Sequence, residues 1–182
     1  MRRISGTASG NVGMAAVQIA ASWDARVWGG VRSDQGASFV AGLGVRPARD
    51  WGGTQTDVLA DSVDVIIELV GGLHARDNLA ALAPQGRMVF VAAQGDEELV
   101  LPLKDIKTKR ATIIGSTLRR RGHAAKAEAV AAFGEEIVPL LAARRVLPRI
   151  ARTFPAERAA AAFDFMSSRG KQGKVLIDLT SR

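Results

Sequence analysis

The segment Ser5-Gly6-Thr7-Ala8-Ser9-Gly10-Asn11-Val12-Gly13 is the most informative part of this sequence, and an apolar run from Met14 to Trp23 follows it directly. A short β-prone run precedes it, so the order is strand, tight glycine turn and helix. The first-turn N–H groups of such a helix lack intrahelical partners, and with the helix dipole they favour an anion in the turn. Gly10 can adopt a positive φ and leaves room for a ligand, and Gly13 lets the helix lie close to the strand.

The glycine spacing departs from the dinucleotide-binding pattern G-x-G-x-x-G. Gly10 and Gly13 supply its last two glycines, but Ala8 stands where the first one would fall. A glycine cluster alone is weak evidence, and its structural context must decide. The turn by itself therefore leaves two interpretations open, an anion-binding turn and a purely structural connection.

The composition favours one α/β domain, or one domain with an appendage, in a chain of 182 residues. Hydrophobic residues make up 47% and aromatic residues only 5%, so Ala, Val, Leu and Ile must form the core. The chain has no cysteine, which excludes disulfides, thiolate zinc sites and a cysteine nucleophile. No apolar run approaches the roughly 20 residues of a membrane span, and no signal peptide is recognisable. We expect a cytoplasmic protein without a membrane partner.

The net charge of +7 raises the question of nucleic-acid binding. Basic residues are scattered, and only Lys104–Arg110 and Arg119–Arg121 form clusters. Neither cluster carries interleaved aromatic side chains on which bases could stack. We therefore expect no nucleic-acid partner, because an arginine-rich surface or a phosphorylated cofactor explains the charge equally well.

Strand patterns alternate with helical patterns along the whole chain. The expected strands or extended pieces cover residues 2–5, 26–31, 45–51, 63–70, 87–92, 112–116, 146–154 and 174–179. The expected helices cover residues 12–23, 33–43, 54–61, 74–82, 124–144 and 155–168. This alternation predicts a doubly wound parallel sheet, the Rossmann fold, followed by a C-terminal helix-strand tail. Ligands of such sheets bind beyond the carboxyl ends of the strands.

Helical spacing also predicts which side chains face inward. The first helix places Val12, Ala16, Ile19, Ala20 and Trp23 on one face. The helix over 155–168 would bury Ala159, Phe163 and Met166. The helix over 124–144 contains Pro139, which predicts a kink.

Five motifs in order resemble the quinone oxidoreductase branch of the medium-chain dehydrogenase/reductase superfamily. They are GTASGNVGMAAVQIA, VDVIIELVGG, PQGRMVFVAA, IIGSTLRRR and GKQGKVLIDL. The resemblance covers nearly the whole chain. It implies a Rossmann dinucleotide-binding domain over residues 1–145 and a tail over 146–182 that returns to the catalytic domain. It also implies NADPH as cofactor, no zinc, and a small-molecule substrate, either a quinone or an enone.

Two features depart from that family. Thr7 stands where Ala or Gly is common, and the N-terminal GroES-like domain, which builds much of the substrate pocket, is not present. We therefore expect the NADPH-binding portion of a quinone oxidoreductase-like enzyme, either a fragment, a mispredicted start or a natural short form. The alternative is a non-catalytic nucleotide-binding module that has lost its substrate domain. A homodimer formed through an under-packed tail also stays open.

The first two connecting loops carry the expected phosphate contacts. Gly10, Asn11, Val12 and Gly13 would bind the pyrophosphate through backbone N–H groups. An NAD enzyme would place an acid about 20 residues further on, to bind the ribose hydroxyls. Arg32 and Ser33 stand there instead and could bind a 2′-phosphate, the arginine through a forked contact, although a solvated surface arginine is the simpler alternative. Asp34 lies close enough to keep NADH as the weaker option.

The remaining expected cofactor contacts rest on the resemblance. Val70 and Gly71, and then Val91, Ala92 and Ala93, occupy loops that in the family flank the adenine ribose and the nicotinamide. Lys171 lies in a stretch that resembles the family's cofactor-covering end. Ordinary strand termination and helix-end charge are the structural alternatives.

No catalytic acid, base or nucleophile can be assigned, so the catalytic residues stay unknown. His74 and His123 lie in separate segments without nearby ligand partners, and no metal site is expected. The lack of an assignable catalytic group fits hydride transfer, because in that reaction the cofactor carries the chemistry and the protein positions it.

Overall fold

The computed structural model describes residues 3–7, 10–31, 33–49, 59–92, 98–168 and 171–180. Its main sheet has six strands in the order β3-β2-β1-β4-β5-β6, and every neighbouring pair is parallel. The strands are β1 (Arg3–Thr7), β2 (Arg26–Val31), β3 (Arg46–Arg49), β4 (Val63–Glu68), β5 (Leu82–Phe90) and β6 (Thr112–Gly115). This is the strand order of dinucleotide-binding folds, and it confirms the predicted doubly wound α/β sheet.

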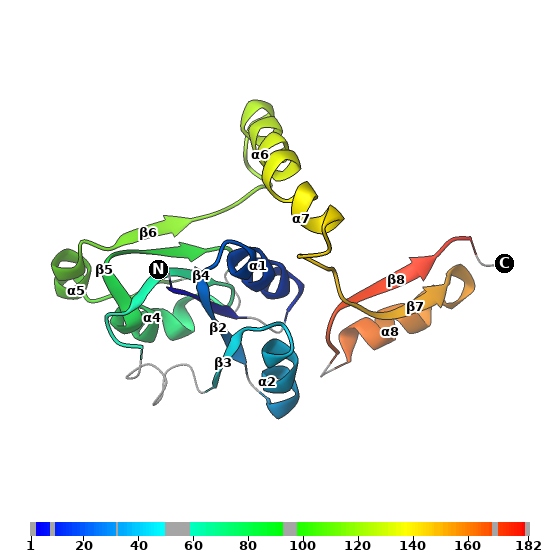
Figure 1. Cartoon of the computed structure of the whole chain (residues 1–182), viewed down its shortest axis with the longest axis horizontal. Helices are drawn as coiled ribbons and strands as arrows, with labels where there is room; N and C mark the ends of the chain where they lie inside the picture. Colours follow the sequence, from blue (N-terminus) through cyan, green and yellow to red (C-terminus); the bar gives the residue numbers. More distant parts are fainter. Residues whose placement is uncertain are drawn as a thin grey trace.

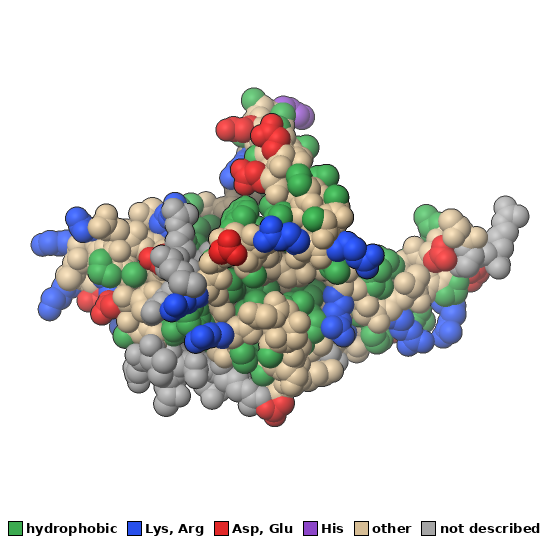
Figure 2. Space-filling view, viewed as in Figure 1, with side chains coloured by type: hydrophobic (Ala, Val, Ile, Leu, Met, Phe, Trp, Pro, Cys, Tyr) green, Lys and Arg blue, Asp and Glu red, His purple; other side chains and the backbone are tan. Residues whose placement is uncertain are grey.

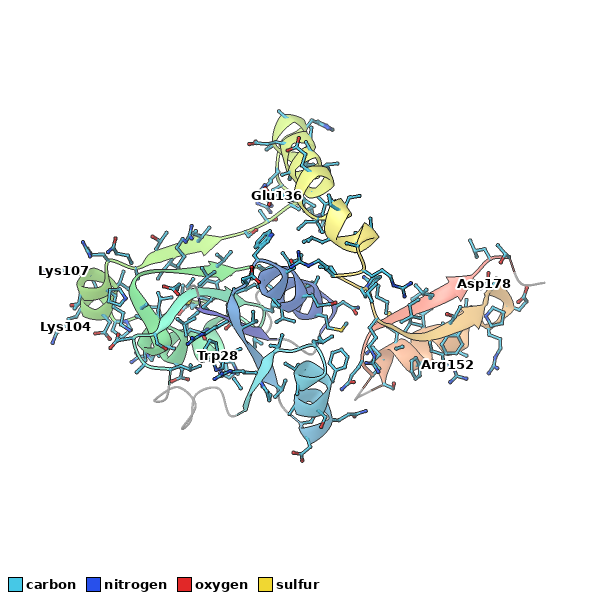
Figure 3. All side chains as sticks on the ribbon, in the orientation of Figure 1. Trp28, Lys104, Lys107, Glu136, Arg152 and Asp178 are labelled. Carbon is cyan, nitrogen blue, oxygen red and sulfur yellow. The ribbon has the colours of Figure 1, made fainter. Side chains whose placement is uncertain are left out.

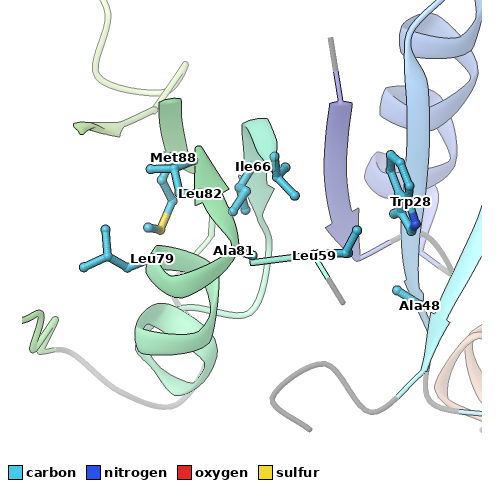
Figure 4. Packing of buried hydrophobic residues seen from close by; sticks show 9 residues of the cluster. Trp28, Ala48, Leu59, Ile66, Leu79, Ala81, Leu82 and Met88 are labelled. Carbon is cyan, nitrogen blue, oxygen red and sulfur yellow. The ribbon is translucent and has the colours of Figure 1, made fainter. Parts of the chain in front are cut away.

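In the described part of the chain, four helices connect these strands and cover the two faces of the sheet (Figure 1). They are α1 (Asn11–Ser22), α2 (Asp34–Ala41), α4 (Ala75–Ala81) and α5 (Leu103–Lys109). One core cluster joins α1 and α2 to β2, and a second joins α4 to the strands from β2 to β5 (Figure 4). Alternation along β2 explains the two clusters, because Val27 and Val31 enter the first and Trp28 the second.

Between β3 and β4 the order in which strands are added to the sheet reverses, while all strands stay parallel. Ser5 on β1 pairs with Trp28 of β2 on one side and with Ile66 of β4 on the other. The strands after β1 therefore extend the sheet in one direction, and those from β4 onward extend it in the other. The position between β1 and β4, where the strand order reverses, is the switch point of the sheet. In such sheets a ligand usually binds beyond the carboxyl ends of the strands at this point, in the region named the crevice from here on.

The C-terminal third leaves the main sheet (Figure 1). Helices α6 (His123–Glu136) and α7 (Val138–Ala142) rise from it, and then β7 (Ile150–Pro155), α8 (Ala159–Ser167) and β8 (Lys174–Asp178) form a separate two-stranded lobe. Short 3-10 helices occupy Gly72–His74 and Ala156–Arg158. Many apolar side chains of this third are exposed, among them Val130 at 70% and Phe163 at 60%.

Several element predictions need correction. Helix α5 was not expected, although Pro102 before it, Asp105 in its first turn and lysines in its last turn are typical helix-end signals. The helix over 124–144 breaks at Ile137, two residues before Pro139, in agreement with the predicted kink. The expected helix over 54–61 lies mostly outside the described residues, and residues 59–61 form a turn.

Two predicted helix faces are wrong. In α1 the buried side chains are Met14, Val17 and Ala20, whereas Val12 and Trp23 are 55% and 56% exposed. In α8 only Ala162 is buried, and Met166 is 46% exposed. Across the parts of the chain that the structure describes, no helix is both long and apolar enough to span a membrane.

Candidate cofactor-binding site

The first turn of α1 opens onto the crevice at the carboxyl end of β1. Gly10 is the N-cap residue, and its carbonyl accepts a hydrogen bond of 2.8 Å from the N–H of Met14. Gly10 has no side chain to cap this end, and the first-turn N–H groups of Asn11, Val12 and Gly13 have no intrahelical acceptor. Gly10, Asn11 and Val12 are exposed and Gly13 is buried. The arrangement offers several donors and the positive end of a dipole to an anion.

Gly10 contributes to this turn by leaving room for a ligand, and its backbone conformation is ordinary. Its φ is −93° and its ψ is 167°, so the positive φ that glycine permits is not used. A Cβ atom added to Gly10 would find no heavy atom within 4 Å. The space beside the helix N-terminus is therefore open, as a ligand at this position requires.

Ser33 begins the next helix at the same edge of the sheet. It is the N-cap residue of α2, and its Oγ accepts a hydrogen bond of 3.1 Å from the N–H of Gly36. A serine hydroxyl keeps one hydrogen to donate, so Ser33 can cap α2 and still bind an anion. Asp34 follows in the exposed first turn. Arg32, the other residue expected to bind a 2′-phosphate, lies outside the described residues.

The loop after β4 is built around a buried carboxylate. Oε1 of Glu68 accepts hydrogen bonds from the N–H groups of Val70, at 2.5 Å, and Gly71, at 3.2 Å. Oε2 accepts one of 2.6 Å from Nδ2 of Asn78 on α4. Gly71 has φ 119° and ψ −145°, a conformation that is essentially restricted to glycine. Both expected site residues of this loop thus owe their positions to Glu68.

Glu68 was not singled out from the sequence. It is 4% exposed, and Asn78 is 1% exposed. A signal was present, because Glu68 follows the apolar run Val65–Ile67 and stands three residues before the glycine pair Gly71-Gly72. A buried carboxylate needs hydrogen-bond partners, and free N–H groups in the following turn are the nearest ones.

The loop after β5 lies beside the loop after β4. The N–H of Val91 donates a hydrogen bond of 2.9 Å to the Glu68 carbonyl, and the N–H of Ser116 donates one of 2.8 Å to the Phe90 carbonyl. Val91 is 41% exposed and Ala92 is half-buried. These two residues therefore line the same edge as Gly71, whereas Ala93 lies outside the described residues.

Lys171 lies between α8 and β8, where its Nζ donates a hydrogen bond of 3.3 Å to the Ser168 carbonyl. Its neighbour Gln172 donates from Nε2 to the carbonyl of Gln35, in the first turn of α2, at 3.1 Å. The lobe therefore brings the segment around Lys171 to the helix end that Ser33 caps. Of the expected residues in the described part, Lys171 is the one contributed by the lobe.

A separate shallow hollow lies away from this edge. Its volume is about 270 Å³, and Gln18, Ala21, Ser22, Leu43 and Arg145 line it. Gln18, Ala21 and Ser22 lie in the C-terminal half of α1, Leu43 follows α2, and Arg145 follows α7. Nη2 of Arg145 donates a hydrogen bond of 2.6 Å to the Ser22 carbonyl. The hollow is thus part of the joint between α1 and the C-terminal third, not of the crevice.

The described residues do not fit a zinc site. Within the described ranges, no three His, Asp or Glu side chains lie close enough to share a metal ion, and the whole sequence has no cysteine. His74 ends the 3-10 helix after β4, and His123 begins the distant α6. No chemical step is therefore assigned to a metal.

The chain matches known oxidoreductases over most of its length. Residues 36–177 match the family model described as zinc-binding dehydrogenase. The quinone oxidoreductase of Sus scrofa is 29% identical over 184 aligned positions, covering 93% of this chain and 52% of that protein. The chain thus spans about half the length of the curated relatives that it matches.

Solved structures agree with these matches. A quinone oxidoreductase from Thermus thermophilus, solved also in complex with NADPH, has a TM-score of 0.78 and 27% identity, over 98% of this chain and 58% of that one. A cobalt- and zinc-bound alcohol dehydrogenase from Pyrobaculum aerophilum has a TM-score of 0.76 and 25% identity, over 97% and 49%. The chain therefore belongs to the zinc-binding dehydrogenase family of the medium-chain dehydrogenase/reductase superfamily, and it resembles the nucleotide-binding domain of these oxidoreductases.

Proposed function

We propose that this chain binds NADPH as the cofactor-binding portion of a quinone oxidoreductase-like enzyme. The observation that carries the proposal is the open N-terminus of α1 at the switch point of the sheet, with Ser33 rather than an acid capping the neighbouring helix. The relatives named quinone oxidoreductase support the reaction class. When bound, the cofactor would supply the hydride that reduces a quinone or an enone.

Each part of the crevice has a distinct task in this proposal. The N–H groups of Asn11, Val12 and Gly13 would hold the pyrophosphate. Ser33, with Arg32, would bind the 2′-phosphate, and Lys171 would approach it from the lobe. The loops at Gly71 and at Val91–Ala93, which the resemblance places beside the adenine ribose and the nicotinamide, would both position the nicotinamide half, because they follow β4 and β5, across the sheet from β2. Residues 1–145 would form the cofactor domain, and residues 146–182 would belong to the catalytic side.

The experiment is a titration of the purified chain with NADPH and NADH, followed by fluorescence. We expect NADPH to bind more tightly, and Arg32→Ala to remove most of the difference. One charge-assisted hydrogen bond is worth about 1.5–3 kcal/mol, which corresponds to about ten- to a hundredfold in affinity. Arg26→Ala is the matched control, because this exposed arginine begins β2, at the end of the strand opposite to its carboxyl end. Equal affinities for the two cofactors would exclude the phosphate role.

The alternative is a nucleotide-binding module without catalysis. It is favoured by the exposed apolar side chains of α6 and of the lobe, among them Val130 and Phe163, which the described residues leave uncovered. Enzymes gain much of their rate by holding both reactants in one orientation. Quinone reduction by the isolated chain separates the two candidates. We expect cofactor binding with very poor turnover, and recovery when a GroES-like domain from a relative is restored.

A further inference from the structure

The buried carboxylate of Glu68 joins three parts of the chain at the crevice. It ends β4, its Oε1 accepts the N–H groups of Val70 and Gly71, and its Oε2 accepts the side-chain amide of Asn78 on α4. With 4% exposure, this side chain cannot itself reach a ligand in the crevice. A buried charge is retained only with strong partners, so these three contacts hold the strand end, the turn and α4 together.

The direction of these contacts decides what the loop can offer to a ligand. A trans peptide unit is planar, and its N–H and C=O point in opposite directions. Because the N–H groups of Val70 and Gly71 point to Glu68, the carbonyls of Leu69 and Val70 point away from the carboxylate. The loop therefore turns acceptors, not donors, away from the protein core. Such a loop suits hydroxyl and amide hydrogens of a ligand and does not suit a phosphate.

The two sides of the switch point thus have opposite chemistry. The start of α1 offers N–H donors without intrahelical acceptors, and Ser33 adds a hydroxyl on the β2 side. The β4 side offers carbonyl acceptors. A dinucleotide that places its phosphates on α1 and its adenosine half over β2 must extend its other half over the β4 loop.

We propose that Glu68 is a positioning residue for the nicotinamide half of the cofactor, acting through the Val70–Gly71 loop with Asn78 as its partner. The inference rests on the proposed binding of NADPH. It assigns to Glu68 no contact with the cofactor. Its carboxylate keeps the N–H groups of Val70 and Gly71 turned toward it, and the carbonyls of Leu69 and Val70 therefore stay turned away from it.

The test compares NADPH with adenosine 2′,5′-bisphosphate, a ligand that lacks the nicotinamide half. Both are titrated by calorimetry into the 182-residue chain and its variants. In Glu68→Gln one oxygen acceptor becomes a donor that faces the Asn78 amide. We expect the NADPH dissociation constant to rise about tenfold or more, and that of the bisphosphate to stay within about twofold. Glu128→Gln, an exposed glutamate on α6, is the matched control and should leave both constants unchanged.

Exchanging the amide and the carboxylate between positions 68 and 78 tests whether the lost NADPH affinity can be restored. Asn78→Asp alone would bring two buried carboxylates together, and we expect it to be the least stable variant in thermal unfolding. Glu68→Gln with Asn78→Asp restores a donor opposite an acceptor and should recover most of the NADPH affinity. If Glu68→Gln does not fold, Glu68→Asp keeps the charge but is too short to reach both Gly71 and Asn78, and it should show the same selective loss.

The outcomes separate the inference from the proposed function. A loss of equal size for both ligands would mean a merely structural role and would overturn the inference. Unchanged NADPH affinity in Glu68→Gln would overturn it as well, while binding by the parent chain would leave the proposed function standing. If the parent chain binds neither ligand, the proposed function fails and the inference fails with it.

Discussion

Lys109, the last residue of α5, should contribute more to stability than any exposed lysine of that helix. Its Nζ donates hydrogen bonds to the carbonyls of Leu79, at 2.6 Å, and of Ala80 and Leu82, both at 2.8 Å. The same ammonium lies 2.9 Å from Oδ1 of Asp61. The carbonyls belong to the end of α4 and the start of β5, where a helix leaves acceptors unpaired. Replacing Lys109 by Met keeps the aliphatic stem and removes every one of these donors.

The size of the effect follows from the exposure of the two partners. The Lys109 side chain is 13% exposed, so its bonds to the carbonyls are largely shielded from water. Losing hydrogen bonds to a charged donor costs about 1.5–3 kcal/mol. The favourable placement of a cation at a helix C-terminus adds about 0.3–1 kcal/mol. Asp61 is 68% exposed, so its ion pair adds little. We expect Lys109→Met to lower the free energy of unfolding by about 2–4 kcal/mol.

Urea unfolding at equilibrium measures this difference, with the m-value checked for constancy. Asp61→Asn should cost less than about 1 kcal/mol, because an exposed pair is screened by water. Lys107→Met is the matched control, since Lys107 is exposed on the same helix and points away from the sheet (Figure 3). A Lys109→Met variant that loses no more stability than Asp61→Asn or Lys107→Met would refute the capping role of Lys109.

Three further changes test other parts of the structure. Gly71→Ala should lower the free energy of unfolding by about 1–3 kcal/mol in the same urea assay, because φ 119° is strained for any side chain. Ser33→Ala should cost about 0.5–2 kcal/mol through the lost cap, and Ser33→Gly should recover stability but not NADPH affinity, as unfolding and titration together would reveal. Gln18→Ala should speed amide hydrogen exchange at Leu147, whose N–H donates to Oε1 of Gln18 at 3.0 Å. Unchanged exchange at Leu147 would contradict the role of Gln18 in joining α1 to the C-terminal third.

The doubly wound parallel sheet was predictable from the sequence, because it follows from the alternation of strand and helix patterns along the chain. The apolar run ending at Glu68 reads as a strand covered on both faces, and that strand is central in the sheet. The buried face of α1 could not be predicted from the sequence. This helix carries small and apolar residues on all its sides, so spacing alone cannot decide whether Val17 or Ile19 faces the core. In α8 the choice likewise depends on a partner: Phe165 lies 5.8 Å from Phe154 between ring centroids, and Phe163 has no such neighbour among the described contacts.

The roles of Lys109 and Glu68 were hidden for a related reason. Each depends on atoms distant in sequence, 30 residues away for the bond between Lys109 and Leu79 and ten for that between Glu68 and Asn78. A charge cluster reads as a solvated surface until the fold brings carbonyls to it. Figure 2 shows basic side chains distributed over several elements of this face rather than gathered in one patch, so local charge density does not single out Lys109.

The lobe joins the sheet through polar contacts rather than through a shared core. Oε1 and Nε2 of Gln18 both bond to the backbone of Leu147, and the Arg149 guanidinium lies 4.7 Å from the centre of the Phe39 ring. Both core clusters draw their buried members from the sheet and its helices. Water competes for such hydrogen bonds, so separating the lobe costs less than opening either cluster.

This joint links the lobe to the same helices that form the crevice. Gln18 lies on α1, whose N-terminus faces the crevice, and Gln172 bonds to the first turn of α2, beside Ser33. Immediately before β8, Gly173 has φ 113° and a Cβ there would lie 2.6 Å from the Arg149 carbonyl oxygen, so this close approach of two backbone segments requires glycine. Because Gln172 bonds to the first turn of α2, we expect a ligand that orders this turn to bias the position of the lobe as well.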